Sequence, residues 1–153
     1  MSTEKTLIVI TGMGAITPIG NSVAALWEGI QTGRSGSGPI SRFDTSNYAT
    51  KIAAEVKDFN ASDYMDKREA RKMDRFTQYA VAAAKEALED AGLLEDNRIA
   101  GADSSRVGVI LGVGIGGFET FESSYRALME KGPTRVPPMT IPKLIANIAP
   151  GYV

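Results

Sequence analysis

The residues best placed to support chemistry in this chain are the glycines of two turns, each of which follows an apolar run. Residues 10–20 read I-T-G-M-G-A-I-T-P-I-G, and residues 106–117 read R-V-G-V-I-L-G-V-G-I-G-G. Glycine lets a backbone pass close to a ligand or to another element, and it adopts conformations that other residues resist. Strand-to-glycine junctions of this kind are typical of the floor of a binding or active site in α/β proteins.

The side chains most often used for nucleophilic and acid–base catalysis are missing, because the sequence contains no cysteine and no histidine. Serines are present, but none lies in a G-x-S-x-G turn, and no histidine is available to act as a base. The carboxylates form no pair at a spacing that would suggest glycoside hydrolysis. We therefore assign no catalytic residue to this chain.

Composition narrows the other classes of function. Without cysteine or histidine a zinc site would depend on carboxylates alone, so we predict no metal site and no cofactor. The net charge of -1 creates no strong field that would favour nucleic acid or a membrane surface. No apolar stretch approaches the roughly 20 residues that cross a bilayer, and residues 1–5 lack the apolar core of a signal peptide. We expect a soluble, cytoplasmic protein.

The glycines of the second turn leave two interpretations open. Residues 112–117 match G-x-G-x-x-G between a predicted strand and a predicted helix, as a dinucleotide-binding fingerprint does. That fingerprint also needs an acidic residue about 20 residues further on, at the end of a strand, whereas Glu130 lies in a predicted helix. The other interpretation is that the glycines allow a strand and a helix to pack closely around the turn.

Five cations lie in the first turns of the longest predicted helix: Lys67, Arg68, Arg71, Lys72 and Arg75. Cations at a helix N-terminus oppose the helix dipole, at about 0.3–1 kcal/mol each when exposed. Residues that work against local stability suggest a function, and an acidic partner would provide one. The alternative is a solvated face whose charge is reduced by neighbouring carboxylates.

The elements that must position these residues alternate between strands and helices. Residues 7–11 and 107–111 are apolar without alternation, which predicts strands covered on both faces. A first helix is predicted to be capped by Asn21 or Ser22 and to end at about Thr32. Further helices are predicted from Asp66 to Gly92, from residue 118 to 131, and from Pro142 onward. Asp66 and Glu69 have the spacing of a capping box, and the many alanines of the long helix imply that another backbone approaches it closely.

This alternation predicts an α/β fold with a mainly parallel sheet and helices on its faces. Residues 33–39 are predicted to form a loop, and residues 51–56 a short edge strand. Only two central strands are predicted, whereas a sheet usually has about five or six. Either strands are hidden in the predicted loops, or residues 1–153 are the front part of a longer domain, which is the interpretation we favour.

Four separate segments resemble the β-ketoacyl-[acyl-carrier-protein] synthases, and most closely the type II enzymes of bacterial fatty acid synthesis. These segments are V-I-T-G-M-G-A-I-T-P-I-G-N at 9–21, F-D-T-S-N-Y-A-T-K-I-A-A-E-V-K-D-F at 43–59, R-K-M-D-R-F-T-Q-Y-A at 71–80 and R-V-G-V-I-L-G-V-G-I-G-G at 106–117. The resemblance implies the N-terminal half of a thiolase-like fold, whose sheet is incomplete in this chain, in a homodimeric protein.

The resemblance also implies a reaction and a partner. The family transfers an acyl group from acyl carrier protein to a cysteine, then condenses it with malonyl carrier protein and releases carbon dioxide. Its cysteine, two histidines and lysine have no counterpart in this chain. Ile115 corresponds to the residue that lines the end of the acyl-chain pocket. Lys67, Arg68, Arg71 and Lys72 correspond to part of the surface on which acyl carrier protein docks.

Three hypotheses follow. The first is a condensing acyltransferase of fatty acid synthesis, of which this chain is the N-terminal part and, lacking the nucleophile, is inactive alone. The second is a non-catalytic module that binds carrier protein or caps a partner. The third is a small nucleotide-binding α/β domain.

Overall fold

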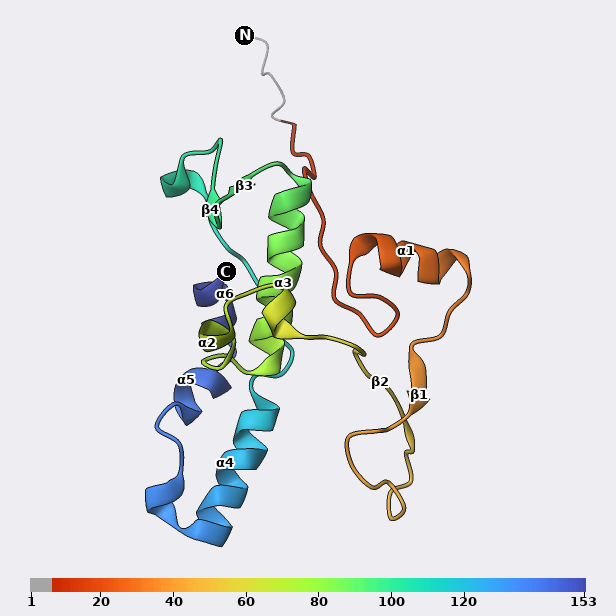
Figure 1. The fold of residues 1–153 in the computed structure, drawn as a ribbon, viewed down its shortest axis with the longest axis vertical. Coiled ribbons are helices and arrows are strands. Elements are labelled where there is room, and N and C mark those ends of the chain that lie inside the picture. Colours follow the sequence, from red (N-terminus) through yellow and green to blue (C-terminus); the bar gives the residue numbers. More distant parts are fainter. Residues whose placement is uncertain (1–6) are drawn as a thin grey trace.

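The structure is a computed structural model that describes residues 7–153 (Figure 1). The prediction for residues 1–5 therefore lies outside the described residues. The helices are α1 Val23–Gln31, α2 Lys67–Ala70, α3 Arg75–Asp90, α4 Phe118–Lys131, α5 Thr140–Leu144 and α6 Ile148–Tyr152. The strands are β1 Ser37–Pro39, β2 Ile52–Ala54, β3 Leu94–Glu95 and β4 Arg98–Ile99, and the short 3-10 helices are η1 Ala61–Asp63, η2 Ser104–Arg106 and η3 Pro133–Arg135.

Helix α3 is the centre of the molecule. Helices α2, α5 and α6 lie on one side of it, while the chain before α1 descends along the other side and leads to the arm formed by α1, β1 and β2 (Figure 1). Helix α3 contacts α6, and α4 contacts α5. The most buried apolar residues, Ala70, Met73, Ala82 and Ala149, lie on or near α2, α3 and α6. The core is therefore a thin layer between helices.

Local signals account for most helix ends. The Ser22 side chain accepts a hydrogen bond from the Ala25 amide at 3.1 Å and caps α1, so Ser22 is the cap of the two predicted candidates. At the end of α3, Gly92 has φ +66, and the amides of Gly92 and Leu93 donate to the carbonyls of Glu89 and Leu88. This is a Schellman motif, which confirms Gly92 as the residue that ends the helix.

The predicted helix from Asp66 to Gly92 is two helices. Asp66 caps α2 by accepting from the Arg68 amide at 2.7 Å, but the Glu69 side chain bonds Lys72 and leaves the capping box incomplete. Helix α2 ends at Ala70, and α3 begins after Asp74, whose backbone is extended at φ -77 and ψ 165. The predicted last helix is also divided, into α5 and α6, because the backbone of Ile145 is extended.

The small sheets differ from the prediction. Strands β1 and β2 pair antiparallel, with Gly38 opposite Ala53, so the edge strand predicted within residues 51–56 is confirmed. The loop predicted for residues 33–39 is wrong at β1, because pairing with β2 orders those residues. Strands β3 and β4 form a second antiparallel pair.

The two central strands predicted at residues 7–11 and 107–111 do not form in the described part of the chain. A strand needs a neighbour to receive its backbone hydrogen bonds, and no strand within residues 7–153 pairs with either segment. Leu7 is 84% exposed and Ile110 is 100% exposed. The mainly parallel sheet is therefore replaced, within residues 7–153, by two-stranded antiparallel pairs and unpaired apolar segments.

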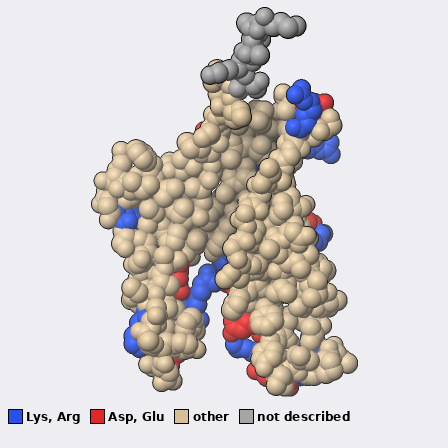
Figure 2. Space-filling view, turned by 180° about the vertical axis from the view of Figure 1, so that it is seen from behind, with Lys and Arg blue, Asp and Glu red and all other residues tan. Residues whose placement is uncertain are grey.

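One face of the molecule is poor in charge (Figure 2). Seen from behind, the surface carries few charged side chains, which gather at its margins and in the hollow between its two lower lobes (Figure 2). Monomeric proteins rarely expose contiguous apolar residues, so the exposed run Leu7 to Ile10 is typical of a surface that other protein covers. No helix within residues 7–153 has the length and apolar character needed to cross a bilayer.

Candidate functional site

The first glycine turn is packed against α3. A Cβ atom added to Gly14 would overlap the carbonyl oxygen of Ala83, and one added to Gly12 would overlap the carbonyl oxygen of Ala87. This contact confirms the prediction that another backbone approaches the alanines of the long helix. The glycines at this junction are used for packing, as the structural interpretation of such turns expects.

Two carboxylates of α3 fix the same segment. The Glu86 carboxylate accepts hydrogen bonds from the amides of Ala15 and Val23, both at 2.8 Å. The Asp90 carboxylate accepts a hydrogen bond from the amide of Met13 at 3.0 Å. These bonds tie the residues before α1, and the first residue of α1, to the central helix at three points. The first turn therefore has a positioning role, and it sets where α1 begins.

The second glycine turn has an open part and a packed part. A Cβ atom added to Gly112 or Gly114 would meet nothing within 4 Å. A Cβ atom added to Gly116 would overlap the Leu144 carbonyl oxygen, and the Gly117 amide donates to that same oxygen at 2.9 Å. Ile115 lies between the two parts, and its side chain is 71% exposed.

A carboxylate occupies the start of the helix that follows this turn. The Asp74 side chain accepts hydrogen bonds from the amide of Thr120, at 2.9 Å, and from its hydroxyl. Thr120 is the third residue of α4, so Asp74 lies where a dinucleotide fingerprint would hold the pyrophosphate. Two anions at one helix end repel each other, and this arrangement disfavours the dinucleotide interpretation.

The four cations Lys67, Arg68, Arg71 and Lys72 form an exposed cluster, here called the basic patch. The Lys72 Nζ atom is 2.6 Å from the Glu69 Oε1 atom. This hydrogen bond is the main cause that raises the pKa of the Lys72 ammonium above its ordinary value. No carboxylate of residues 7–153 lies within 4.0 Å of the other three cations. Three positive charges are thus available to an acidic partner.

The prediction that these cations oppose a helix dipole is wrong for Arg71 and Lys72. Arg71 is the C-terminal cap of α2, and Lys72 follows it, so both lie at a helix end that favours cations. Arg75 is the first residue of α3, and its guanidinium is 3.4 Å from the Glu119 carboxylate of α4. The feature of these cations that suits docking is therefore their exposure without carboxylate partners within residues 7–153, and not a cost to helix stability.

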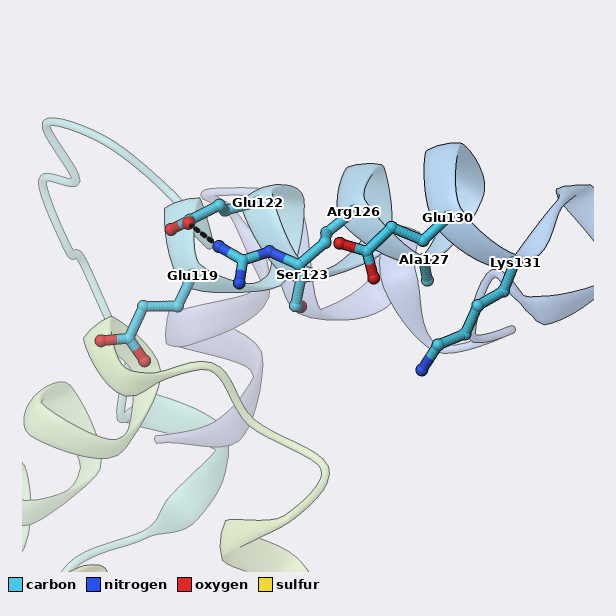
Figure 3. Close-up of a pocket in the computed structure, with 7 residues that line it drawn as sticks. All are labelled: Glu119, Glu122, Ser123, Arg126, Ala127, Glu130 and Lys131. Atoms are coloured by element: carbon cyan, nitrogen blue, oxygen red, sulfur yellow. Dashed lines mark hydrogen bonds and ion pairs between the residues drawn. The ribbon is translucent and has the colours of Figure 1, made fainter. Parts of the chain in front are cut away.

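The outer face of α4 contains a shallow groove of about 290 Å³. All seven of its lining residues come from this helix, and Arg126 is paired with Glu122 at 2.8 Å (Figure 3). Acidic and basic side chains are mixed along it, as on a solvated helix surface. The described residues hold no cluster of acidic side chains that could bind a metal ion.

Comparison with known proteins identifies the family. The family model described as "Beta-ketoacyl synthase, N-terminal domain" matches residues 5–153. The chain belongs to this family. It is 51% identical over 147 residues to 3-oxoacyl-[acyl-carrier-protein] synthase 2 of Staphylococcus aureus strain N315, a match that covers 95% of the chain and 34% of that relative. The protein of the same description from Synechocystis is 46% identical, with 97% of the chain and 35% of the relative covered.

Solved β-ketoacyl synthases share the fold. The ishigamide ketosynthase/chain length factor matches with a TM-score of 0.75 and 32% identity over 92% of the chain and 34% of its own. A type II polyketide ketosynthase in complex with its acyl-carrier protein matches with a TM-score of 0.73 and 27% identity over 94% of the chain and 36% of its own. These matches confirm the predicted thiolase-like fold. The chain spans about a third of the length of the relatives it matches.

The predicted site residues come from separate parts of the chain. Ile115 and the basic patch lie on different elements, the turn before α4 and the segment around α2. Asp74, which joins the starts of α3 and α4, is one of the carboxylates near the cations of the basic patch, and the sequence alone gives it no further role. No local pattern in the sequence marks this role, because the hydrogen-bond partner of the Asp74 side chain lies 46 residues further along the chain.

Proposed function

We propose that this chain is the N-terminal part of a condensing acyltransferase of fatty acid biosynthesis, a β-ketoacyl-[acyl-carrier-protein] synthase. The observation that carries the proposal is the family match over residues 5–153, together with the shared fold. In this reaction a cysteine thiolate takes the acyl group from a carrier-protein thioester. Decarboxylation of a malonyl thioester then gives a carbanion that attacks the acyl carbon and releases the cysteine.

The chain itself contributes surfaces to this reaction and no nucleophile, since it has no cysteine. The basic patch would receive acyl carrier protein, which is acidic and presents the acyl group on a phosphopantetheine arm. Support comes from the three cations that have no carboxylate partner within residues 7–153 and from a related ketosynthase solved with its carrier protein. Charges at the rim of an interface chiefly steer the encounter of the two proteins.

Ile115 would line the end of the pocket for the growing acyl chain. It is a large apolar side chain that is 71% exposed within residues 7–153, and it follows glycines with open space around them. An alkyl tail would bury this side chain, which is favourable by roughly 25 cal/mol per Å² of apolar surface. A β-branched residue has few rotamers, so it defines the pocket end more sharply than a flexible one would.

The unpaired segments at residues 7–11 and 107–111 support a larger assembly. We propose that further strands of the same domain pair with them, that the complete protein is a homodimer, and that it works in the cytoplasm. The absence of cysteine and histidine keeps one alternative open, a non-catalytic module that binds carrier protein.

Changing the size of residue 115 tests the proposed pocket. The suitable protein is a chimera in which this chain replaces the matching third of the Staphylococcus aureus relative. Ile115→Phe should lower elongation of the longest accepted acyl substrate by about tenfold or more, because a clash of about 1.4 kcal/mol gives that factor. Elongation of the shortest substrate should change little. Product lengths are measured by mass spectrometry.

Ile115→Val is the matched control, since it keeps the shape of the side chain and should retain the product profile. A profile for Ile115→Phe identical to that of the unsubstituted chimera would contradict the assignment of Ile115 to the pocket.

A further inference from the structure

Asp74 makes an unusual set of contacts for a residue that precedes a helix. Its backbone carbonyl accepts hydrogen bonds from the amides of Thr77 and Gln78 in the first turn of α3. Its side chain does not cap that helix and instead bonds the amide and hydroxyl of Thr120 in α4. Asp74 is only 7% exposed. A single buried residue therefore joins the N-terminal ends of the two longest helices.

The same carboxylate also touches the glycine turn. A Cβ atom added to Gly117 would lie 3.0 Å from Asp74 Oδ2, a tight contact, and would overlap the Lys143 carbonyl oxygen, a clash with backbone that only a glycine avoids. On the other side the Gly117 amide is bonded to the Leu144 carbonyl of α5. Gly117 is held between α3 and α5, and Ile115 precedes it by two residues.

An ion pair reinforces this junction. Arg75, next to Asp74, is 3.4 Å from Glu119, next to Thr120. Arg42 from the segment between β1 and β2 also pairs with Glu119. The Asp74 carboxylate lies at the start of α4, where the dipole of that helix stabilises a negative charge. Because Asp74 is buried, its hydrogen bonds to Thr120 are stronger than they would be in water. The turn is thus anchored on its C-terminal side, while Gly112 and Gly114 have open space around them.

We infer that Asp74 is a positioning residue that sets which acyl lengths are accepted, by holding the turn from Ile115 to Gly117. The inference rests on the proposed function, because it concerns the residue assigned to the pocket end. Asp74 does not touch substrate in this account. Its effect passes through Thr120 and Gly117 to Ile115. Loss of the carboxylate should let Ile115 move and so relax the upper limit on chain length.

The test compares Asp74→Ala and Asp74→Asn in the chimera. Both hydrogen bonds from Thr120 reach one oxygen, which asparagine can supply through its amide carbonyl. Asp74→Ala should raise elongation of substrates beyond the normal limit by about threefold or more, and Asp74→Asn should restore a profile close to that of the unsubstituted chimera. Thr120→Val should shift the profile in the direction of Asp74→Ala, and it provides the test if Asp74→Ala does not fold.

Asp90→Ala is the matched control. Asp90 lies on the same helix and also accepts a backbone amide from a glycine turn, but that turn is the first one. It should leave the product profile unchanged. Amide hydrogen exchange of the peptide 112–121 gives a second readout, and it should become at least about threefold faster in Asp74→Ala and stay unchanged in Asp90→Ala.

The outcomes separate the two proposals. If Ile115→Phe changes the product profile but Asp74→Ala and Thr120→Val do not, Asp74 is only a structural contact and the inference is overturned. If Ile115→Phe also leaves the profile unchanged, the proposed pocket fails, and the inference fails with it.

Discussion

Replacing Gly14 with alanine should destabilise the chain by about 3 kcal/mol, at the upper end of what an extra methyl group costs in a packed interior. The new Cβ atom would overlap the Ala83 carbonyl oxygen and lie 2.9 Å from the Ala87 amide nitrogen. These are backbone atoms of α3, so no rotamer change relieves the clash. The turn and the helix would have to separate, which would also stretch the bonds from Ala15 and Met13 to α3.

The effect is measured as a lower urea midpoint for the loss of helical circular dichroism. Gly108→Ala is the matched control, because a Cβ atom there would meet nothing within 4 Å. That substitution should change stability by no more than about 0.5 kcal/mol. Equal midpoints for the two variants would show that the turn does not pack on α3 as described.

Reversing two charges of the basic patch should weaken binding of acyl carrier protein. Arg68 and Arg71 are exposed and have no carboxylate partner within residues 7–153, so their charge is directed at solvent or at a partner. Arg68→Glu with Arg71→Glu should raise the Kd about tenfold to a hundredfold at low salt, because each attraction becomes a repulsion. The dependence of the Kd on salt should flatten as well, since fewer attractive charges remain to be screened.

A double variant with the same change in net charge separates this effect from a general loss of positive charge. Arg34→Glu with Lys51→Glu alters one cation that follows α1 and one that precedes β2, in the arm that Figure 1 places across α3 from α2. Titration of fluorescently labelled carrier protein should give a Kd within about threefold of the unsubstituted protein for this control. Equal weakening in both double variants would mean that the basic patch is an ordinary solvated surface.

Helix ends could be predicted from sequence because their causes are local. Ser22 caps α1 and Gly92 ends α3 through bonds to residues within one or two turns. The break between α2 and α3 could not be predicted this way. It occurs at Asp74, whose side chain bonds Thr120, 46 residues further along the chain. A contact at that separation leaves no periodic pattern in the sequence.

Strands were harder to predict than helices for the same physical reason. The β1 segment, S-G-P, has no strand propensity of its own and is ordered by its pairing with β2. Residues 7–11 and 107–111 have strong strand character, yet no partner strand lies beside them within residues 7–153. An apolar run shows that a segment has strand propensity, whereas the strand forms only if a partner strand lies next to it.

Some features of the candidate site could be predicted from the sequence, and others could not. The absence of a nucleophile follows from composition alone, since no cysteine or histidine occurs. Ile115 and the basic patch were assigned from resemblance to the ketosynthases, and their spacing alone would not have identified them. Asp74 became visible only when its burial and its bonds to α4 were seen together.

The most direct test of the central claim is a condensation assay with acyl and malonyl carrier-protein thioesters, on the chain alone and on the chimera. Our account predicts β-ketoacyl product from the chimera and none from the chain alone, because these residues supply substrate-facing surfaces but no thiol. A chimera that folds and binds carrier protein but forms no carbon–carbon bond would contradict the account and favour a binding module. Product formed by the chain alone would contradict it as well.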